Sequence, residues 1–277
     1  MRFHAREVDG TGQVGRLARV PVVLASVAKI LITVEFARQA VAGLVDPAER
    51  VVARREDRLG GSGLADFADD AELSLRDCAR LAMTISDNTA ADLLLDRVGE
   101  EPVRLLAREL GLDGVRFRGG PRALLREVLE RSRALGVAPA QVVEHDPERV
   151  TSAAPADVTR LLQLVWTDAA APPGACAFVR SLMGAQLART RIASGFGTGV
   201  RVSVKSGTLP GLRAEAGVVE YPDGGRYAVA VFAVGADAAG EGGRGALEAD
   251  MALGRVAREA VDRLRSGSAG GEGGERG

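Results

Sequence analysis

The sequence predicts an α+β fold in which strands from both ends of the chain form one antiparallel sheet flanked by helices, with an all-helical lobe inserted between them. Three observations support this prediction. Short strand-like stretches open the chain, a long central part follows a helical period, and strand-like stretches return before a last helix. With 277 residues, of which 46% are hydrophobic, the chain can bury a sizeable core.

The N-terminal part predicts a hairpin followed by a helix. Residues 2–8 and 14–20 flank the glycine-containing turn DGTGQ, which is typical of two paired strands. Residues 26–42 form an apolar stretch of helical length that ends near Gly43, and glycine commonly terminates helices. The segment VDPAERV then begins a loop.

The central part of the chain is predicted to be helical. The pattern is helical from residue 73 to about 110, with breaks at TISDNTA and at VGEEP. Amphipathic patterns then predict three further helices, at 121–136, 155–168 and 174–189.

Strands return in the last third of the chain. After SGFGTG the period becomes that of strands in VRVSVKS, AEAGVVEY and RYAVAVFAV, and PDGG predicts a hairpin turn between the last two. A final helix is predicted over 243–265, and SGSAGGEGGERG is predicted to be disordered. The sequence therefore predicts a discontinuous α/β lobe, made of residues 1–42 and 196–266. A helical lobe at 43–195 is inserted into it, and a disordered tail follows at 267–277.

Composition limits the kinds of partner. The net charge of −1 and the pI near 6.2 give no basic field for nucleic acid or an anionic membrane, which leaves small molecules or peptides. The most apolar stretch, 20–37, contains Lys29 and Glu35, so no membrane span is expected.

Cys78 and Cys176 lack zinc-ligand spacing and are predicted to be buried or free thiols, with a single disulfide as the less favoured alternative. No metal or cofactor is expected, and the protein is predicted to be a monomer.

The first ten residues, MRFHAREVDG, lack the charged and then apolar pattern of a signal peptide. If the chain is complete, the sequence therefore predicts a cytoplasmic protein. If it has been trimmed, a secreted protein stays open.

Two residue types are so rare that the positions which keep them carry information. Of the 36 basic residues only Lys29 and Lys205 are lysines, and Asn88 is the single asparagine. Arginine serves as well as lysine on a solvated surface, but it cannot release its proton and act as a base. The two lysines are therefore candidates for positions that require an amine.

Ser26 is a candidate nucleophile with Lys29 as its base. His4 and His145 lie in no recognisable triad context, and no GxSxG motif is present, so a Ser-His-Asp arrangement is not favoured. Lysine can replace histidine as the base when burial and a nearby cation favour the neutral amine. Ser26 and Lys29, three residues apart, would lie within reach of each other on one helix face. Alone, SVAK could equally be a serine cap followed by a solvent-reaching lysine.

Two further short motifs accompany SVAK. SDN covers residues 86–88 and by itself is typical of a helix cap or turn. KSGT covers residues 205–208 and by itself could be a strand end with a glycine turn. Together, in this order, the three motifs use both lysines and the only asparagine, which favours a shared site.

SVAK, SDN and KSGT resemble the SxxK, SDN and KTG motifs of the serine β-lactamase and penicillin-binding protein superfamily, and class A β-lactamases are the most similar. The segments LSLRDCARLAMTISDNTAADLLLDRVG and TSAAPADVTRLLQLVW also look like parts of that family. The resemblance implies a β-lactamase/transpeptidase-like fold. It also implies a serine hydrolase that opens β-lactam or related amide and ester substrates, including peptide-like ones, through an acyl-enzyme on Ser26.

The resemblance also implies a role for each motif residue. Ser26 would be the nucleophile, Lys29 its general base, and Ser86 the proton relay to the leaving nitrogen. Lys205 would act electrostatically and hold the substrate carboxylate. Asn88 would bind the substrate amide, and the backbone N–H groups of Ser26 and Thr208 would bind the oxyanion. The remaining substrate contacts would come from the KSGT strand and from an arginine 14 residues before its lysine: Ser206, Gly207, Thr208 and Arg191.

The sequence departs from class A in the step that releases the acyl group. Those enzymes activate water with a glutamate in an ExxLN motif, and this chain cannot contain the motif because its one asparagine is Asn88. Residues 116–150 take the place of that loop and predict a helix. Thr33 stands where some class A enzymes have the disulfide partner of Cys78. The acidic candidates for activating water, each of which could instead be a surface charge, are Glu127, Glu130, Glu144 and Asp146.

Two alternatives stay open beside hydrolysis. One is a penicillin-binding-like acyltransferase or esterase with slow deacylation, because the acylation residues are present and the deacylating group is not. The other is a non-catalytic ligand-binding member of the fold.

Overall fold

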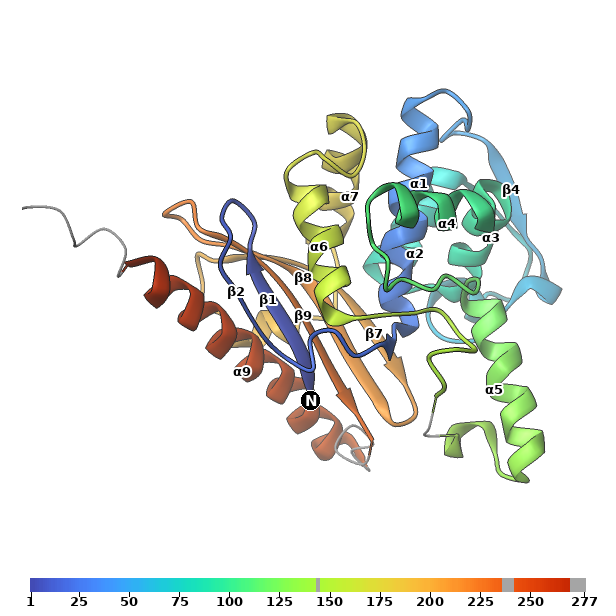
Figure 1. Cartoon of the computed structure of the whole chain (residues 1–277). Coiled ribbons are helices and arrows are strands. Elements are labelled where there is room, and N and C mark those ends of the chain that lie inside the picture. The colour runs from blue at the N-terminus through green and yellow to red at the C-terminus, as the bar shows by residue number, and fades with distance from the viewer. Residues whose placement is uncertain (143–144, 236–241, 270–277) are drawn as a thin grey trace, which may run out of the picture.

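The computed structural model describes residues 1–142, 145–235 and 242–269. Within them, five strands form an antiparallel sheet in the order β2-β1-β9-β8-β7. Strand β1 pairs with β9 with Phe3 opposite Val231, so the two ends of the chain meet in one sheet as the sequence predicts (Figure 1). The strands are β1 (Arg2–Glu7), β2 (Gln13–Arg16), β7 (Arg201–Leu209), β8 (Leu212–Glu220) and β9 (Arg226–Val234).

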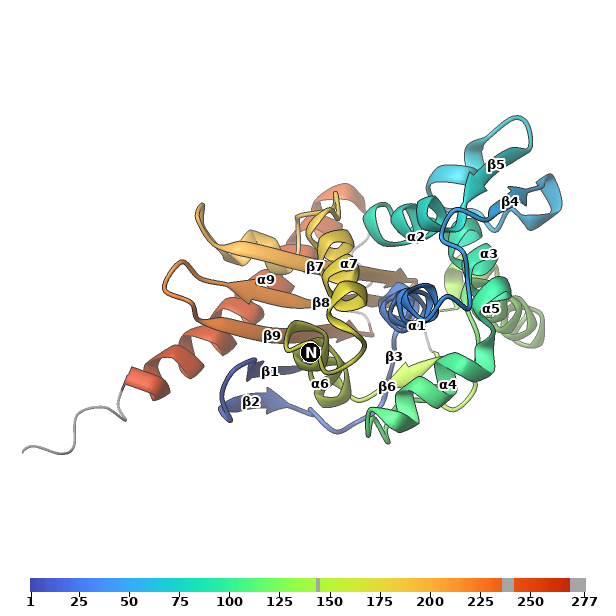
Figure 2. The same ribbon diagram turned by 90° about the horizontal axis from the view of Figure 1, so that it is seen from above.

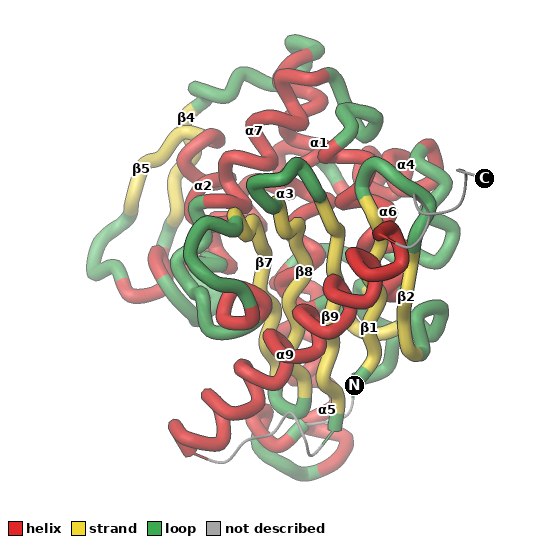
Figure 3. The backbone as a smooth tube through the Cα atoms, turned by 90° about the vertical axis from the view of Figure 1, so that its left-hand side faces the viewer, coloured by secondary structure: helices red, strands yellow, loops and turns green. Residues whose placement is uncertain are grey.

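Helices cover both faces of this sheet, which explains why its central strands are apolar on both sides. In β9, Val229 and Val231 pack in the core beneath α9 (Gly242–Ala269), whereas Ala230 and Phe232 pack in the core on the opposite face. On that face lie α6 (Pro155–Trp166) and α7 (Pro173–Gly184), with α1 (Lys29–Val41) beside α7 (Figure 2). Figure 3 shows α9 running obliquely across the strands.

The central helices end where the motif sequences interrupt them. Ser74 accepts a hydrogen bond from Asp77 N at the start of α2, and Asp87 accepts one from Ala90 N at the start of α3. Asp87 is thus a helix cap, which leaves Ser86 and Asn88 on either side of it to face the site. The helices are α2 (Leu75–Thr84), α3 (Asn88–Val98), α4 (Glu100–Glu109) and α5 (Pro121–Leu135).

Two short strand pairs were not predicted, because each strand contains only two or four residues and is too short to show a strand period. They are β3 (Val22–Val23) with β6 (Ser152–Ala153), and β4 (Arg50–Ala53) with β5 (Ala71–Ser74). The last helix is also longer than predicted, because α9 continues to Ala269, inside the segment predicted as a tail. Residues 270–277 lie outside the described part. The division into two lobes stays a prediction. Helices α6 and α7, which it assigns to the helical lobe, pack directly on the sheet.

The predicted helix from Ser26 is divided into two parts. Ala25–Ala28 form the 3-10 turn η1, and α1 begins at Lys29. Ala25 has a φ of 47°, in the left-handed region that is costly for a residue with a side chain. This conformation produces a sharp turn between the short strand β3 and η1. The helical period of the sequence does not indicate such a turn.

Among the described residues, Cys78 and Cys176 are buried free thiols. No helix in residues 1–142, 145–235 or 242–269 combines the length and hydropathy that a membrane span requires.

Candidate active site

Ser26 lies where η1 meets the open edge of the sheet. It is partly exposed and lines a cavity of about 310 Å³. Strand β7 approaches it closely, because a Cβ added at Gly207 would lie 2.9 Å from Leu24 O and 3.2 Å from Ser26 N. The glycine of KSGT therefore allows β7 to contact the turn that carries Ser26.

Lys29 is almost completely buried, with 1% of its surface exposed. Its Nζ lies 2.6 Å from Ser86 O, 2.8 Å from Asn88 Oδ1 and 3.3 Å from Ser86 Oγ. Burial lowers the pKa of Lys29 to about 7, although nearby Asp87 and Asp92 oppose this effect. At neutral pH a substantial fraction of this lysine is consequently a neutral amine.

Ser86 joins the two lysines. Lys205 Nζ donates to Ser86 Oγ at 3.0 Å and to Ser206 O at 2.8 Å. The pKa of Lys205 is well below its ordinary value, first because it is buried and second because Lys29 repels its charge. Ser86 itself has a φ of 63°, a strained conformation that is typical of functional positions. Its hydroxyl is therefore fixed between two amines.

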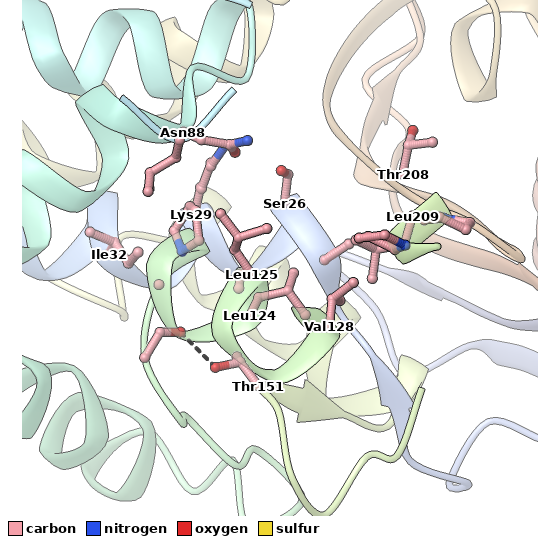
Figure 4. Close-up of a pocket in the computed structure, with 18 of the residues that line it drawn as sticks. Ser26, Lys29, Ile32, Asn88, Leu124, Leu125, Val128, Thr151, Thr208 and Leu209 are labelled. Atoms are coloured by element: carbon pink, nitrogen blue, oxygen red, sulfur yellow. Dashed lines mark hydrogen bonds between the residues drawn. The ribbon is translucent and has the colours of Figure 1, made fainter. Parts of the chain in front are cut away.

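The edge strand β7 presents backbone N–H groups toward Ser26. Ser206 N donates to Gln186 Oε1 at 2.7 Å, outside the ladder with β8. Because N–H directions repeat every two residues along a strand, Thr208 N points the same way. Thr208 and Ser26 line the same cavity, and Figure 4 shows them across from each other with Lys29 and Asn88 nearby.

Arg191 is placed behind β7 and does not line the cavity. It donates to Gly207 O at 2.8 Å, to Ala214 O at 2.7 Å and to Thr208 Oγ1 at 2.7 Å, and it pairs with Asp250 at 2.8 Å. Since Thr208 Oγ1 accepts from Arg191, its own hydrogen is free to donate elsewhere. The contact seen for Arg191 is thus one that orients Thr208, and direct binding of a substrate carboxylate stays a prediction.

Two polar residues behind the KSGT strand were not found in the sequence analysis. Glu215, in β8, is fully buried, and it accepts from Gln186 Nε2 at 3.2 Å and from Ile192 N at 2.6 Å. Gln186 in turn accepts from Ser206 N. Burial raises the pKa of Glu215 to about 7. The available signal was a glutamate inside an otherwise apolar strand pattern, AEAGVV.

We expect Glu215→Gln to lower the free energy of unfolding by about 1–3 kcal/mol at pH about 5. The two carboxyl oxygens accept from Gln186 and Ile192, whereas glutamine has one acceptor oxygen and would leave one of these buried donors facing its NH₂ group. The difference should shrink as the pH rises from 4.5 to about 7. Over that range the wild-type folded state binds the Glu215 proton more tightly than the unfolded state, so stability falls with pH.

Urea unfolding at several pH values measures this effect. The matched control is Glu220→Gln, at the partly buried end of the same strand, which we expect to change stability by less than about 0.5 kcal/mol. A constant difference between wild type and Glu215→Gln across the pH range would contradict the assignment.

The cavity beside Ser26 is mainly apolar. Lys29 is the one ionisable side chain among the residues that line it, and no Asp or Glu of the described part does so. Four of the predicted site residues line it: Ser26, Lys29, Asn88 and Thr208. Ser86 and Lys205 join them through hydrogen bonds, and Ser206, Gly207 and Arg191 belong to or support the strand behind.

The acidic candidates for activating water do not lie in this cavity. Glu127 and Glu130 both pair with Arg149, at 2.5 and 3.6 Å. Asp146 accepts from Glu148 N at 2.8 Å within its own loop. Glu144 lies outside the described residues. The three described candidates are therefore engaged away from Ser26.

Helix α5 lies beside the cavity. It belongs to residues 116–150, the segment that takes the place of the loop with the ExxLN motif. Buried Asp92 of α3 accepts from Arg122 N at 2.7 Å and so fixes the first turn of α5, as an acidic cap does. A Cβ at Gly120 would lie 2.3 Å from Asp92 Oδ1, so the glycine makes room for this carboxylate. The cap fixes α5 with three apolar side chains lining the cavity: Leu124, Leu125 and Val128.

A serine on a turn before a buried lysine, a second serine between two lysines, and an adjacent sheet edge are the features of the serine β-lactamase and penicillin-binding protein superfamily. The chain belongs to the Beta-lactamase enzyme family, whose model matches residues 1–264.

Individual relatives differ in what their names state. The chain is 31% identical over 280 residues to the beta-lactamase regulatory protein BlaB of Streptomyces cacaoi, which covers 90% of this chain and 84% of that protein. The structure of a β-lactamase from Sphaerobacter thermophilus superposes with a TM-score of 0.78 at 25% identity, covering 96% of this chain and 91% of that one. The structure of a PBP-A mutant, in an acyl-enzyme complex with penicillin G, superposes with a TM-score of 0.75 at 21% identity. The match covers 95% of this chain and 90% of that one.

Proposed function

We propose that this protein is acylated on Ser26 by β-lactams or related acyl donors and releases the acyl group slowly. The observation that carries the proposal is the combination of an assembled Ser26, Lys29, Ser86 and Lys205 group with a cavity that no described carboxylate lines. The protein would thus act as a penicillin-binding-like protein with slow deacylation and not as a rapid hydrolase.

Acylation follows from the arrangement of the two serines and two lysines. Neutral Lys29 takes the Ser26 hydroxyl proton while Ser26 Oγ bonds to the acyl carbonyl carbon. The N–H groups of Ser26 and Thr208 bind the resulting oxyanion. The bond from carbon to nitrogen then breaks, and Ser86 gives its proton to the leaving nitrogen. Lys29 restores that proton to Ser86, so no proton is gained or lost overall.

Deacylation lacks a comparable group. Hydrolysis of the Ser26 ester requires a water that loses its proton as it attacks, and a positioned base typically accelerates such a step by about 10²- to 10⁴-fold. The side chains that α5 places at the cavity are hydrocarbon and cannot take this proton. The ester is therefore expected to persist.

The rate of acylation should rise with pH through about 7. Lys29 acts as the base only after it has lost its proton, and burial lowers its pKa to about 7. The measurement is the rate of Ser26 adduct formation with benzylpenicillin between about pH 5 and about pH 9, with mass spectrometry as the readout. A rate that is flat or falls with rising pH would contradict this role for Lys29.

A second candidate is a regulatory protein that binds its ligand without covalent chemistry. It is favoured by the name of the Streptomyces cacaoi relative, and by the finding that Lys29 bonds to Ser86 and Asn88 while no described hydrogen bond joins it to Ser26. The two candidates make opposite predictions for covalent labelling.

An intact-mass time course with benzylpenicillin separates the functions. A lasting adduct supports the proposal, and a transient adduct with hydrolysed drug supports a β-lactamase. Reversible binding without an adduct supports the non-covalent regulator and overturns the proposal.

A further inference from the structure

The wall of the cavity opposite Asn88 is apolar. Leu124 and Val128 are four residues apart on α5 and share one helix face, and Leu125 lies next to them. Val128 is buried and Leu124 is partly buried and packs against the core, whereas Leu125 is exposed, so this face of α5 is only partly covered. Figure 4 shows these side chains grouped below Ser26 and Lys29.

Further apolar groups complete the wall from other parts of the chain. Pro139 comes from the 3-10 turn η4 (Pro139–Gln141), Leu209 is the last residue of β7, and Pro210 lies in the β7–β8 turn. His145 Nε2 lies 2.9 Å from Pro210 O and links the loop after η4 to the β7–β8 turn. The lining thus joins two parts of the chain that are distant in sequence, namely α5 with η4, and the end of β7 with the turn after it.

We propose that this wall is the subsite for the side chain of the acyl group, and that the protein selects acyl donors with an uncharged aryl or branched alkyl side chain. The inference rests on the proposed acylation of Ser26. Thr208 and Asn88 occupy the polar rim near the nucleophile, whereas Leu124, Leu125 and Val128 offer no partner to a charged or strongly polar substituent. A cavity of about 310 Å³ accommodates a small ligand of this kind.

The same wall disfavours a peptide donor whose acyl side chain ends in a carboxylate or an ammonium group. Such a group would lose its hydration against hydrocarbon without gaining an ion pair, because the one ionisable lining residue, Lys29, already donates to Ser86 O and Asn88 Oδ1. The selectivity therefore arises from the desolvation of the side chain and not from contacts to the reacting carbonyl.

Benzylpenicillin and carbenicillin test this inference, because carbenicillin adds one carboxylate to the same benzyl side chain. We expect Ser26 to be acylated at least about 10-fold faster by benzylpenicillin, as measured by intact mass at subsaturating drug. Leu124→Arg should reduce or invert this preference by giving the carboxylate a partner. Leu135→Arg, on the same helix but 57% exposed and outside the cavity, should leave the preference unchanged.

The outcomes separate this inference from the proposed function. Equal acylation of the wild-type protein by both drugs overturns the apolar subsite and leaves the acylation of Ser26 intact. No adduct with either drug overturns the proposed function itself. If Leu124→Arg does not fold, as judged by circular dichroism, the preference of the wild-type protein still decides the inference.

Discussion

Ser26→Ala is expected to abolish the covalent adduct completely, because no other described serine lines the cavity beside Lys29. Lys29→Ala should slow acylation by about 10²- to 10⁴-fold, the usual contribution of a positioned base. Lys29→Arg should be nearly as slow, since arginine keeps the positive charge but cannot act as a base. Intact mass spectrometry after incubation with benzylpenicillin measures all three variants.

Ser181→Ala is the matched control for the nucleophile. Ser181 lies in α7, and its Oγ donates to Phe178 O at 2.7 Å on the exposed side of the helix. The adduct should form at the wild-type rate in this variant. Unchanged labelling in Ser26→Ala, or wild-type rates in both Lys29 variants, would show that the adduct forms elsewhere or by another route.

Leu125→Glu is expected to accelerate release of the acyl group by about 10²- to 10⁴-fold and to turn a lasting adduct into a transient one. Leu125 lines the same cavity as Ser26, so a carboxylate at this position would share the cavity with the acyl ester. The new carboxylate would supply the base for water that the cavity lacks.

Leu125→Gln distinguishes the base from a change of shape. Glutamine has nearly the same size and polarity as glutamate but cannot take a proton from water at neutral pH. The decay of the adduct after removal of excess drug gives the release rate for both variants. Equal acceleration by Glu and Gln would mean that Leu125 merely excludes water, and no acceleration by Glu would argue against a missing base at this position.

The sequence was sufficient to predict the sheet, most helices and the residues that meet at the site. The site residues could be predicted partly because lysine and asparagine are so rare in this chain. Lys29, Asn88 and Lys205 are its only residues of these two types. Periodicity identified β7, β8 and β9 because each contains nine residues of strand-like pattern. The family and the α+β fold are confirmed, whereas the roles of the site residues stay predictions.

Other features depend on which surfaces meet, and a linear pattern does not contain this information. The helix at 121–136 was predicted, but the pattern of its apolar residues does not indicate that three of them line a cavity. Arg191 was expected at the substrate, yet its guanidinium contacts Thr208 from behind the strand. Glu215 was missed because a lone glutamate in a strand usually marks an exposed position.

The position of β1 within the sheet has a consequence for how the chain acquires its structure. Strand β1 lies between β2 and β9, so residues 2–7 pair with residues 226–234, which are distant in sequence. Such long-range pairing slows folding, because a large loop must close before the contact forms. We therefore expect the sheet that supports Ser26 to form only when residues 226–234 are available for pairing with both β1 and β8, and chains that end before β9 to lack a reactive serine.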